Sequence, residues 1–432
     1  MYQKTILENG IRVLTENIPG VRSVSIGCLL DVGLYDEPPS KNGIAHLSEH
    51  LMFQGTANRD AAEIYRLMDA AGGNIGAFTS RDFTCYHGTV LDDFRTYVFE
   101  LLGDILLNAN FPANHLDLER LAVLREIDAD RDSPTNRLNT LLKGHVWPQH
   151  PLGRPVLGNR ETVRSFNRED VMCFVFKNYH PGRMIIAAAG NVTHEDILSQ
   201  VRDAFWELKP RAAGGVEAAP DPGHHAGFLF EDMPVSQAYF ALGLPLPSYT
   251  APLRYELNLV NKILGGGVSS RLFRRLREEM GLVYQIGTEY HAYRQTGLLV
   301  VEGSTAPESL QTAITAILSE LGKLALGDQP IDEEELWKAK RQLHAQHLIE
   351  SEHSYTRMSR LCTQELYFGH FIPSAEIIRH IEEVHLDSLR QTAAAWLGNG
   401  LRQLALAVVG PEPRVAANTP ALTSLLADYQ NL

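Results

Sequence analysis

Two histidines and a glutamate within five residues are the strongest candidates for chemistry in this chain. Residues 46–50 read His-Leu-Ser-Glu-His, so His46 and His50 are four positions apart and Glu49 directly precedes the second histidine. On a helix this spacing places both imidazoles on one face, one turn apart, where both can reach one metal ion. A hydrolytic zinc site needs such nitrogen ligands, an open position for water and a nearby carboxylate base.

The competing interpretation is an exposed helix that carries these residues by chance, since the chain has 17 histidines among 432 residues. The flanking residues favour a short helix over 43–54, because Asn42 is a good helix-capping residue and Gly55 suits a left-handed stop. We therefore expect this helix to form, and we favour the metal site over the chance arrangement.

A third ligand is expected in the segment 114–127, because a hydrolytic zinc site usually takes a carboxylate there. Glu119 and Glu126 are seven positions apart, which places them on one helix face two turns from each other. The small apolar residues at 122–123 lie between them and indicate partial burial. Without the histidine pair, a solvated charged face would be the better interpretation of both glutamates.

These features together resemble the inverzincin zinc metallopeptidases, the family of pitrilysin, insulin-degrading enzyme and the mitochondrial processing peptidase. The resemblance rests on the H-x-x-E-H order, on a glutamate some 75 residues later with another seven before it, and on the run 43–56. It implies one Zn²⁺ per chain, with Glu49 as general base and Glu119 supporting the site from outside the ligand set. The implied metal ligands are His46, His50 and Glu126.

A second segment supports the same resemblance. The glycine-rich run 265–267 precedes a predicted helix that stops at Gly281, with Arg277 in its last turn and Tyr284 opening the next strand. In isolation, Arg277 would complement the helix dipole and Tyr284 would be an ordinary strand aromatic. The resemblance instead implies that both hold the substrate and stabilise the transition state over the zinc.

The segment 76–82 resembles the family's edge strand, which pairs with the backbone of an extended peptide. The resemblance assigns substrate contacts to Ala77 and Phe78. Gly76 stands where the family often has Asn, so we expect one side-chain contact with the substrate to be lost. Gln54 stands where Lys is usual, and we expect little consequence.

The pattern of strands and helices that would position these residues predicts an α+β fold. Strands mix with helices in both halves, and we expect two homologous half-domains, each a mainly antiparallel sheet with helices packed on one face. Strands at 5–17 and 21–32 are expected to pair antiparallel. The predicted organisation is a zinc-bearing half-domain at 1–212, a linker rich in Pro, Gly and Ala at 213–225, and a second half-domain with the Arg/Tyr pair at 226–432.

The two halves also show a modest internal repeat. At an offset of 216 residues, Gly27 matches Gly243 within similar strand patterns, and Glu126 falls on Gln342 in a second charged helix at 332–347. The zinc helix maps onto a stretch without histidine. We therefore interpret the chain as a duplicated unit in which only the first copy keeps the metal.

Composition narrows the class of protein. Hydrophobic residues make up 44% of the chain, yet no run approaches the roughly 18 apolar residues that span a membrane. No signal peptide is visible, and four scattered cysteines indicate reduced, mostly buried thiols, so we expect a cytoplasmic protein. The net charge of −13 argues against nucleic acid as a partner.

The function predicted from these features is a zinc-dependent endopeptidase that cleaves peptides or unfolded segments. In the resembling family two such chains close a chamber, so we expect a homodimer, and a heterodimer with a related chain stays open. One alternative is a non-catalytic scaffold, like the core subunits of respiratory complexes; another is a metal-binding protein without peptidase activity. The joint presence of the metal ligands, Glu49, Arg277 and Tyr284 favours the enzyme.

Overall fold

The computed structural model of the chain describes residues 1–205, 207–210, 222–412, 414–415 and 418–430. The chain divides into two compact units, each assembled from three stretches. The first comprises Met1–Asp128, Pro155–Pro220 and Leu348–Ile372; the second comprises Ala129–Arg154, Asp221–His347 and Pro373–Leu432. Most of the predicted linker 213–225 lies outside the described residues, so the predicted half-domain boundaries stay predictions.

A six-stranded sheet forms the centre of the first unit. Its strands are β1 (Tyr2–Ile6), β2 (Arg12–Asn17), β3 (Ser23–Leu30), β4 (Asn74–Thr79), β5 (Thr84–Leu91) and β6 (Met184–Gly190). Their order is β1-β2-β6-β3-β5-β4, with β2 and β6 parallel and the other neighbours antiparallel. The predicted pairing of segments 5–17 and 21–32 is wrong, because β6 lies between β2 and β3. Every residue of β6 is buried, as expected of a central strand covered on both faces.

One face of this sheet packs against most helices of the first unit and forms a single apolar core with them. These helices are α1 (Ile44–Met52), α2 (Ala61–Ala70), α3 (Arg95–Asn108), α4 (Ala113–Asp132), α6 (Arg160–Ser165), α7 (Arg168–Asn178) and α8 (His194–Phe205). Short 3₁₀ turns connect them: η1 (Leu34–Asp36), η2 (Pro39–Lys41), η3 (Asp92–Phe94) and η5 (Pro181–Arg183).

The second unit repeats this plan with a five-stranded sheet. Its strands are β7 (Gly227–Asp232), β8 (Ala238–Leu246), β9 (Val283–Ala292), β10 (Gly297–Thr305) and β11 (Ala405–Gly410). The order is β7-β11-β8-β10-β9, and β7 and β11 are the parallel pair. The position of β11 between β7 and β8 matches that of β6 between β2 and β3. The predicted α+β fold with two sheets is therefore confirmed.

Helices of the second unit form one apolar core with one face of its sheet. They are α9 (Arg254–Gly265), α10 (Leu310–Leu326), α11 (Glu333–Glu350), α13 (Ser374–Glu383), α14 (Leu386–Arg402) and α15 (Thr419–Gln430). The predicted helix before Gly281 is wound partly as a π-helix, η6 (Phe273–Glu279), and Gly281 has the left-handed φ of +63° expected of its stop. Two 3₁₀ turns complete the unit, η4 (Pro151–Gly153) and η7 (Pro307–Ser309).

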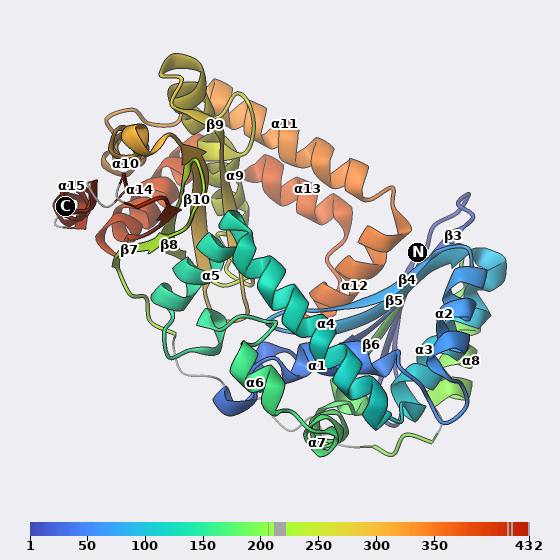
Figure 1. Ribbon diagram of the computed structural model, residues 1–432. Coiled ribbons are helices and arrows are strands. Elements are labelled where there is room, and N and C mark those ends of the chain that lie inside the picture. Colours follow the sequence, from blue (N-terminus) through green and yellow to red (C-terminus); the bar gives the residue numbers. More distant parts are fainter. Residues whose placement is uncertain (206, 211–221, 413, 416–417, 431–432) are drawn as a thin grey trace. The chain divides into compact units, whose positions relative to one another are not determined.

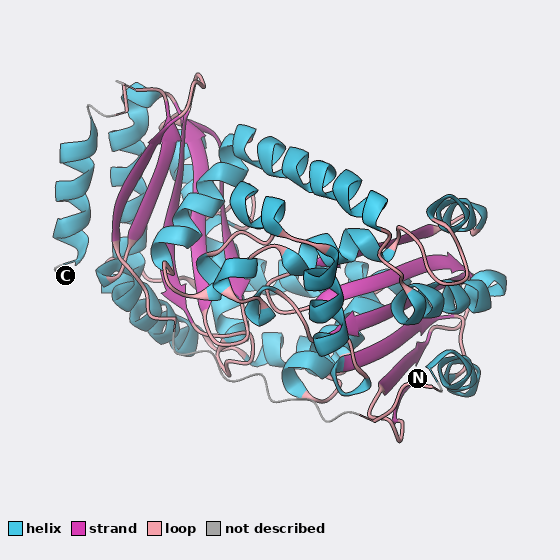
Figure 2. Ribbon diagram, turned by 60° about the horizontal axis from the view of Figure 1, so that its bottom comes forward, coloured by secondary structure: helices cyan, strands magenta, loops and turns pink. Residues whose placement is uncertain are grey.

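The opposite face of each sheet is covered by a helix from the other half of the sequence, which the sequence analysis did not foresee. Helix α12 (Ser354–Phe368) packs on β2, β3 and β6, whereas α5 (Pro134–Val146) packs on β8 and β11. Figure 1 shows the exchange by colour: orange α12 lies on blue strands, and teal α5 lies on yellow-green ones. Each sheet thus has helices on both faces (Figure 2).

Glycines mark where the exchanged helices approach the strands. A Cβ at Gly27 of β3 would lie 2.2 Å from Sδ of Met358 in α12, and a Cβ at Gly243 of β8 would lie 3.2 Å from a methyl of Leu142 in α5. Met358 follows Leu142 by 216 positions, the offset that also separates Gly27 from Gly243. The predicted repeat therefore extends to the helices that are exchanged.

Two further sequence features have structural counterparts. No helix within the described ranges is long and apolar enough to cross a membrane. The four cysteines are free thiols; Cys28, Cys85 and Cys362 are buried and Cys173 is exposed.

We predict that Gly27→Ala destabilises the first unit by about 1–3 kcal/mol, because the added methyl group overpacks the contact with α12. Met358→Ala alone should cost about 2–5 kcal/mol through the cavity it leaves. In the double variant the new methyl group partly fills that cavity, so the combined loss should be smaller than the sum. Urea denaturation of the four proteins measures this coupling, and strictly additive losses would contradict the predicted contact.

Candidate metal centre

Helix α1 carries His46, Glu49 and His50, and its N-terminus is held by a buried carboxylate. The helix begins at Ile44 after Gly43, whose φ is +94°. The prediction that Asn42 caps it is wrong. The carboxylate of Glu37, 4% exposed, accepts hydrogen bonds from the backbone N–H of Gly43 (2.8 Å) and Ala45 (2.9 Å), while the Asn42 amide donates to the same carboxylate. A charged acceptor satisfies these first N–H groups more strongly than a neutral amide.

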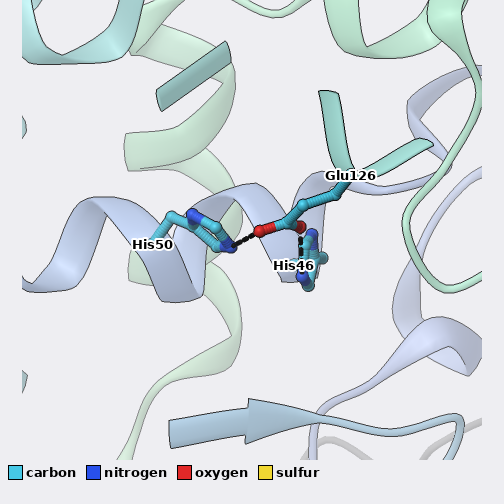
Figure 3. Close-up of side chains that lie close together, drawn as sticks. All are labelled: His46, His50 and Glu126. Carbon is cyan, nitrogen blue, oxygen red and sulfur yellow. Dashed lines mark ion pairs between the residues drawn. The ribbon is translucent and has the colours of Figure 1, made fainter. Parts of the chain in front are cut away.

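Glu126 of α4 faces both histidines of α1, as Figure 3 shows. Its Oε2 lies 3.6 Å from His46 Nε2, and its Oε1 lies 3.6 Å from His50 Nε2. Ligands each about 2.1 Å from a tetrahedral Zn²⁺ would be about 3.4 Å apart, so the spacing fits a shared ion. These three residues are also the group of potential metal ligands that converges within 4.8 Å among the described residues.

Glu119 lies two turns before Glu126 on the same face of α4, and it contacts the other ring nitrogen of His50. The Nδ1 of His50 donates to Oε2 of Glu119 over 2.9 Å. With its proton on Nδ1, the ring has a lone pair on Nε2, the nitrogen that faces Glu126. This is the role expected of a carboxylate that orients a metal-binding histidine.

Burial and neighbouring charges set the protonation of the group. Burial, with a smaller contribution from His50, lowers the pKa of His46 to about 3, so His46 is neutral at physiological pH. Burial alone would lower the pKa of His50, but the hydrogen bond with Glu119 and the charge of Glu126 outweigh it and raise the pKa. Burial raises the pKa of Glu49 against the opposing effect of a hydrogen bond from Thr79. A neutral imidazole is the form that binds a metal.

Gln54, just beyond α1, connects this helix to its neighbours. Its side chain is buried, donates to the hydroxyl of Tyr65 in α2 (2.7 Å) and accepts from Nδ1 of His115 in α4 (2.9 Å). His115 lies one turn before Glu119 on the same face of α4. The residue that departs from the family pattern therefore helps to fix the helix that carries both glutamates.

Thr79 contacts the candidate base Glu49, and the sequence analysis did not single it out. Its Oγ1 donates to Oε2 of Glu49 over 2.5 Å, and Glu49 is only 9% exposed. Thr79 belongs to the segment 76–82, whose alternating side chains could have indicated which residues point toward α1. Glu37 had no comparable local signal, since it precedes the helix by a loop.

The structure places Ala77 and Phe78 on β4, which is the edge strand of its sheet. Within the described strands β4 pairs only with β5, so its outer backbone edge is open to an added strand. A Cβ at Gly76 would meet no atom within 4 Å. The missing side chain at this position thus leaves space over one face of β4.

Arg277 and Tyr284 belong to the second unit, where the structure brings them together. The guanidinium lies 4.5 Å from the centre of the Tyr284 ring and donates to the Tyr284 carbonyl oxygen. The tyrosine side chain is 71% exposed, so its hydroxyl is accessible within that unit. Stacking on a guanidinium fixes the ring without occupying its hydroxyl.

Comparisons with known proteins agree with these observations. Residues 12–160 match the family described as Insulinase (Peptidase family M16), and residues 165–343 match the family described as Peptidase M16 inactive domain. The chain is 33% identical to the uncharacterized zinc protease YmxG of Bacillus subtilis, over 95% of this chain and 98% of that protein. It is equally 33% identical to the uncharacterized zinc protease Rv2782c of Mycobacterium tuberculosis, over 95% and 93%.

Solved structures share the whole fold at lower identity. A protease from Helicobacter pylori superposes with a TM-score of 0.86 at 22% identity, covering 95% of this chain and 99% of its own. A peptidase M16 inactive domain from Pseudomonas fluorescens gives 0.87 at 19% identity, covering 95% and 98%. A chain of Complex III2 from Candida albicans gives 0.83 at 18% identity, covering 99% of both.

We predict that Glu37→Gln weakens zinc binding about 10–100-fold, because one buried backbone N–H at the start of α1 would face an amide NH₂ instead of an oxygen. Titration with a fluorescent zinc chelator measures the affinity. Glu169→Gln is a matched control, since Glu169 is an exposed carboxylate in the first turn of α7. Equal zinc affinity of both variants would contradict a positioning role for Glu37.

Proposed function

Because the chain belongs to the insulinase family M16 of peptidases, we propose that it is a zinc-dependent endopeptidase that cleaves peptides or unfolded segments. The observation that carries this proposal is the convergence of His46, His50 and Glu126, with Glu49 one position before the second histidine. Two neutral nitrogens and one carboxylate oxygen are a donor set of hydrolytic zinc sites. One Zn²⁺ per chain is the cofactor we propose for these ligands.

In the proposed mechanism, zinc supplies Lewis acidity that makes water acidic near neutral pH and polarises the scissile carbonyl. His46 and His50 would hold the zinc through Nε2, and Glu119 would keep the proton of His50 on Nδ1. Glu49 accepts the proton of the attacking water and later delivers it to the leaving amine. The buried position of Glu49 suits this exchange, because a raised pKa brings the carboxylate nearer to working pH.

Substrate contacts are proposed for β4 and for the Arg/Tyr pair. An extended peptide would add as a strand to the outer edge of β4 along Ala77 and Phe78, which leaves its backbone exposed to the site. The Arg277 guanidinium and the Tyr284 hydroxyl would donate to the oxyanion that forms on the scissile carbonyl. Backbone pairing favours peptides or unfolded segments over folded proteins, whose strands are already paired.

We further propose that the enzyme works as a homodimer that encloses its substrate, in the cytoplasm. Support comes from the resemblance to a family in which two chains of this size close a chamber. In a two-fold dimer each chain would supply one zinc unit and one Arg/Tyr unit, so the assembly would be self-sufficient.

A scaffold or partner subunit is the second candidate function, favoured by the structural likeness to a chain of Complex III2 from Candida albicans. Such a role requires no metal ligands. This chain keeps the complete ligand group, which favours catalysis. A heterodimer with a related chain, or a zinc protein without peptidase activity, would be distinguished by the assays below.

We predict that the purified chain cleaves a pool of unstructured peptides and that Glu49→Gln reduces kcat about 10²–10⁴-fold while zinc stays bound. Metal content is measured by mass spectrometry, and a chelator should abolish the wild-type activity until zinc is restored. Loss of zinc in Glu49→Gln would contradict a simple role as base. Stoichiometric zinc without any cleavage would favour a missing partner chain or a non-peptidase function.

We also predict complementation between two inactive variants if Arg277 acts on the zinc site of the partner protomer. Glu49→Gln and Arg277→Ala would each be inactive alone. After unfolding and refolding together in equal amounts, half of the dimers would be mixed, with one complete site each, which restores about a quarter of wild-type activity. Refolding each variant separately is the control. No recovery in the mixture would show that both residues act within one chain.

A further inference from the structure

The hydroxyl of Thr79 donates a hydrogen bond to the carboxylate of Glu49. Its Oγ1 lies 2.5 Å from Oε2 of Glu49, and within the described residues no other side chain donates to this carboxylate. The other oxygen, Oε1, accepts no hydrogen bond from the described part of the chain. One oxygen of Glu49 is therefore held by a hydrogen bond of the protein, and the other has no such donor among the described residues.

The direction of this hydrogen bond follows from the protons that are available. Thr84, paired with Thr79 across β4 and β5, donates its own hydroxyl proton to the carbonyl oxygen of Val32 over 2.9 Å. The two threonine hydroxyls are 3.4 Å apart, so their contact is weak. An ionised carboxylate only accepts, so the single proton of Thr79 goes to Glu49.

Thr79 lies at the end of β4, and hydrogen bonds fix the hairpin that joins β4 to β5. The turn after β4 closes with a hydrogen bond from the Ser80 N–H to the Phe83 carbonyl oxygen (2.8 Å). At the tip of this turn, Asp82 accepts a hydrogen bond from the Tyr367 hydroxyl of α12 (2.5 Å). The exchanged helix thus fixes the hairpin, and the hairpin fixes the hydroxyl that contacts Glu49.

From this arrangement we infer that Thr79 is a positioning residue that aligns Glu49 and links it to the edge strand on which the substrate pairs. This inference rests on the proposed peptidase function and deepens it. β4 presents its outer backbone edge to the peptide and the side chain of Thr79, its last residue, to the base. A peptide that adds to this edge orders the same strand that orients Glu49, so pairing in register promotes proton transfer.

The first test is structural and does not depend on activity. Crystal structures of zinc-loaded wild type, Thr79→Val and Thr79→Ser are compared at Glu49. Valine keeps the branched shape but removes the hydroxyl, and serine keeps the hydroxyl. We expect Glu49 to leave its single conformation in Thr79→Val and to retain it in Thr79→Ser. An unchanged Glu49 conformation in Thr79→Val overturns the inference. If the valine variant does not fold, Thr79→Ala serves the same purpose.

The second test separates kcat from metal binding and from peptide affinity. We expect Thr79→Val to lower kcat about 10–100-fold with unchanged zinc content, and Thr79→Ser to restore kcat to within about threefold of wild type. Parallel losses of zinc and kcat, or equal losses in both variants, overturn the positioning role. In a series of peptides, longer ones that cover more of β4 should lose more kcat on Thr79→Val than a dipeptide derivative does; equal losses refute the link to the strand.

The two tests distinguish failure of this inference from failure of the proposed function. If wild type binds zinc but cleaves no peptide, the peptidase proposal fails, while the crystallographic comparison still decides whether Thr79 orients Glu49. If wild type cleaves peptides and the valine variant matches it in kcat, only the role of Thr79 is refuted.

Discussion

The side-chain contacts between α4 and α1 are the interactions on which the rest of the site depends. Neither helix alone carries a complete set of candidate metal ligands. Together they bring ligand atoms of His46, His50 and Glu126 to within 4.8 Å of one another. The burial of these side chains is unequal: the neutral His46 side chain is 12% exposed, whereas the Glu126 side chain is 44% exposed. Removing a charged carboxylate from water costs several kcal/mol, so keeping it partly solvated limits the strain of assembling the site before a metal binds.

Sequence reasoning grouped the candidate ligands because their spacing is a property of single helices. His46 and His50 are one turn apart, and Glu119 and Glu126 are two turns apart, so periodicity alone groups them. The same reasoning failed for Glu37, because a loop of several residues separates its carboxylate from the N–H groups that it satisfies. Helix capping rules cover the residue next to the helix and do not reach that far.

The fold was predictable to the level of two similar α+β units, and the order of the strands was not. The strand at 184–190 inserts between two strands that are close in sequence, and no local pattern encodes a pairing over more than 150 residues. The exchanged helices were missed for the same reason. Their apolar residues were visible, but the sheet that they cover lies in the other half of the sequence.

The second unit has the same strand plan as the first but different residues at the positions that match the candidate metal ligands. At the offset of 216 residues, Gln342 of α11 matches Glu126 and Gly266 matches His50. The side-chain nitrogen of Gln342 lies 3.8 Å from the place that a Cβ on the next residue, Gly267, would take. At the same offset, Gly265 matches Glu49, and Lys262 matches His46. The unit instead presents Tyr284 on a guanidinium. A shared fold therefore constrains where side chains lie and leaves open what they do.

The exchange of α5 and α12 also has a consequence for the way the protein is made. When α8 ends at Phe205, every strand of the first sheet has been synthesised, but the helix that covers its second face has not. About 160 more residues must be added before α12 is complete at Phe368, which takes roughly 10–30 s on a ribosome. During that interval the apolar face formed by Leu14, Leu29, Cys85 and Ile185 has no partner within its own unit. The nascent chain thus leaves an apolar sheet surface uncovered while more than a third of its residues are added, because the order of its elements delays the helix that buries this surface.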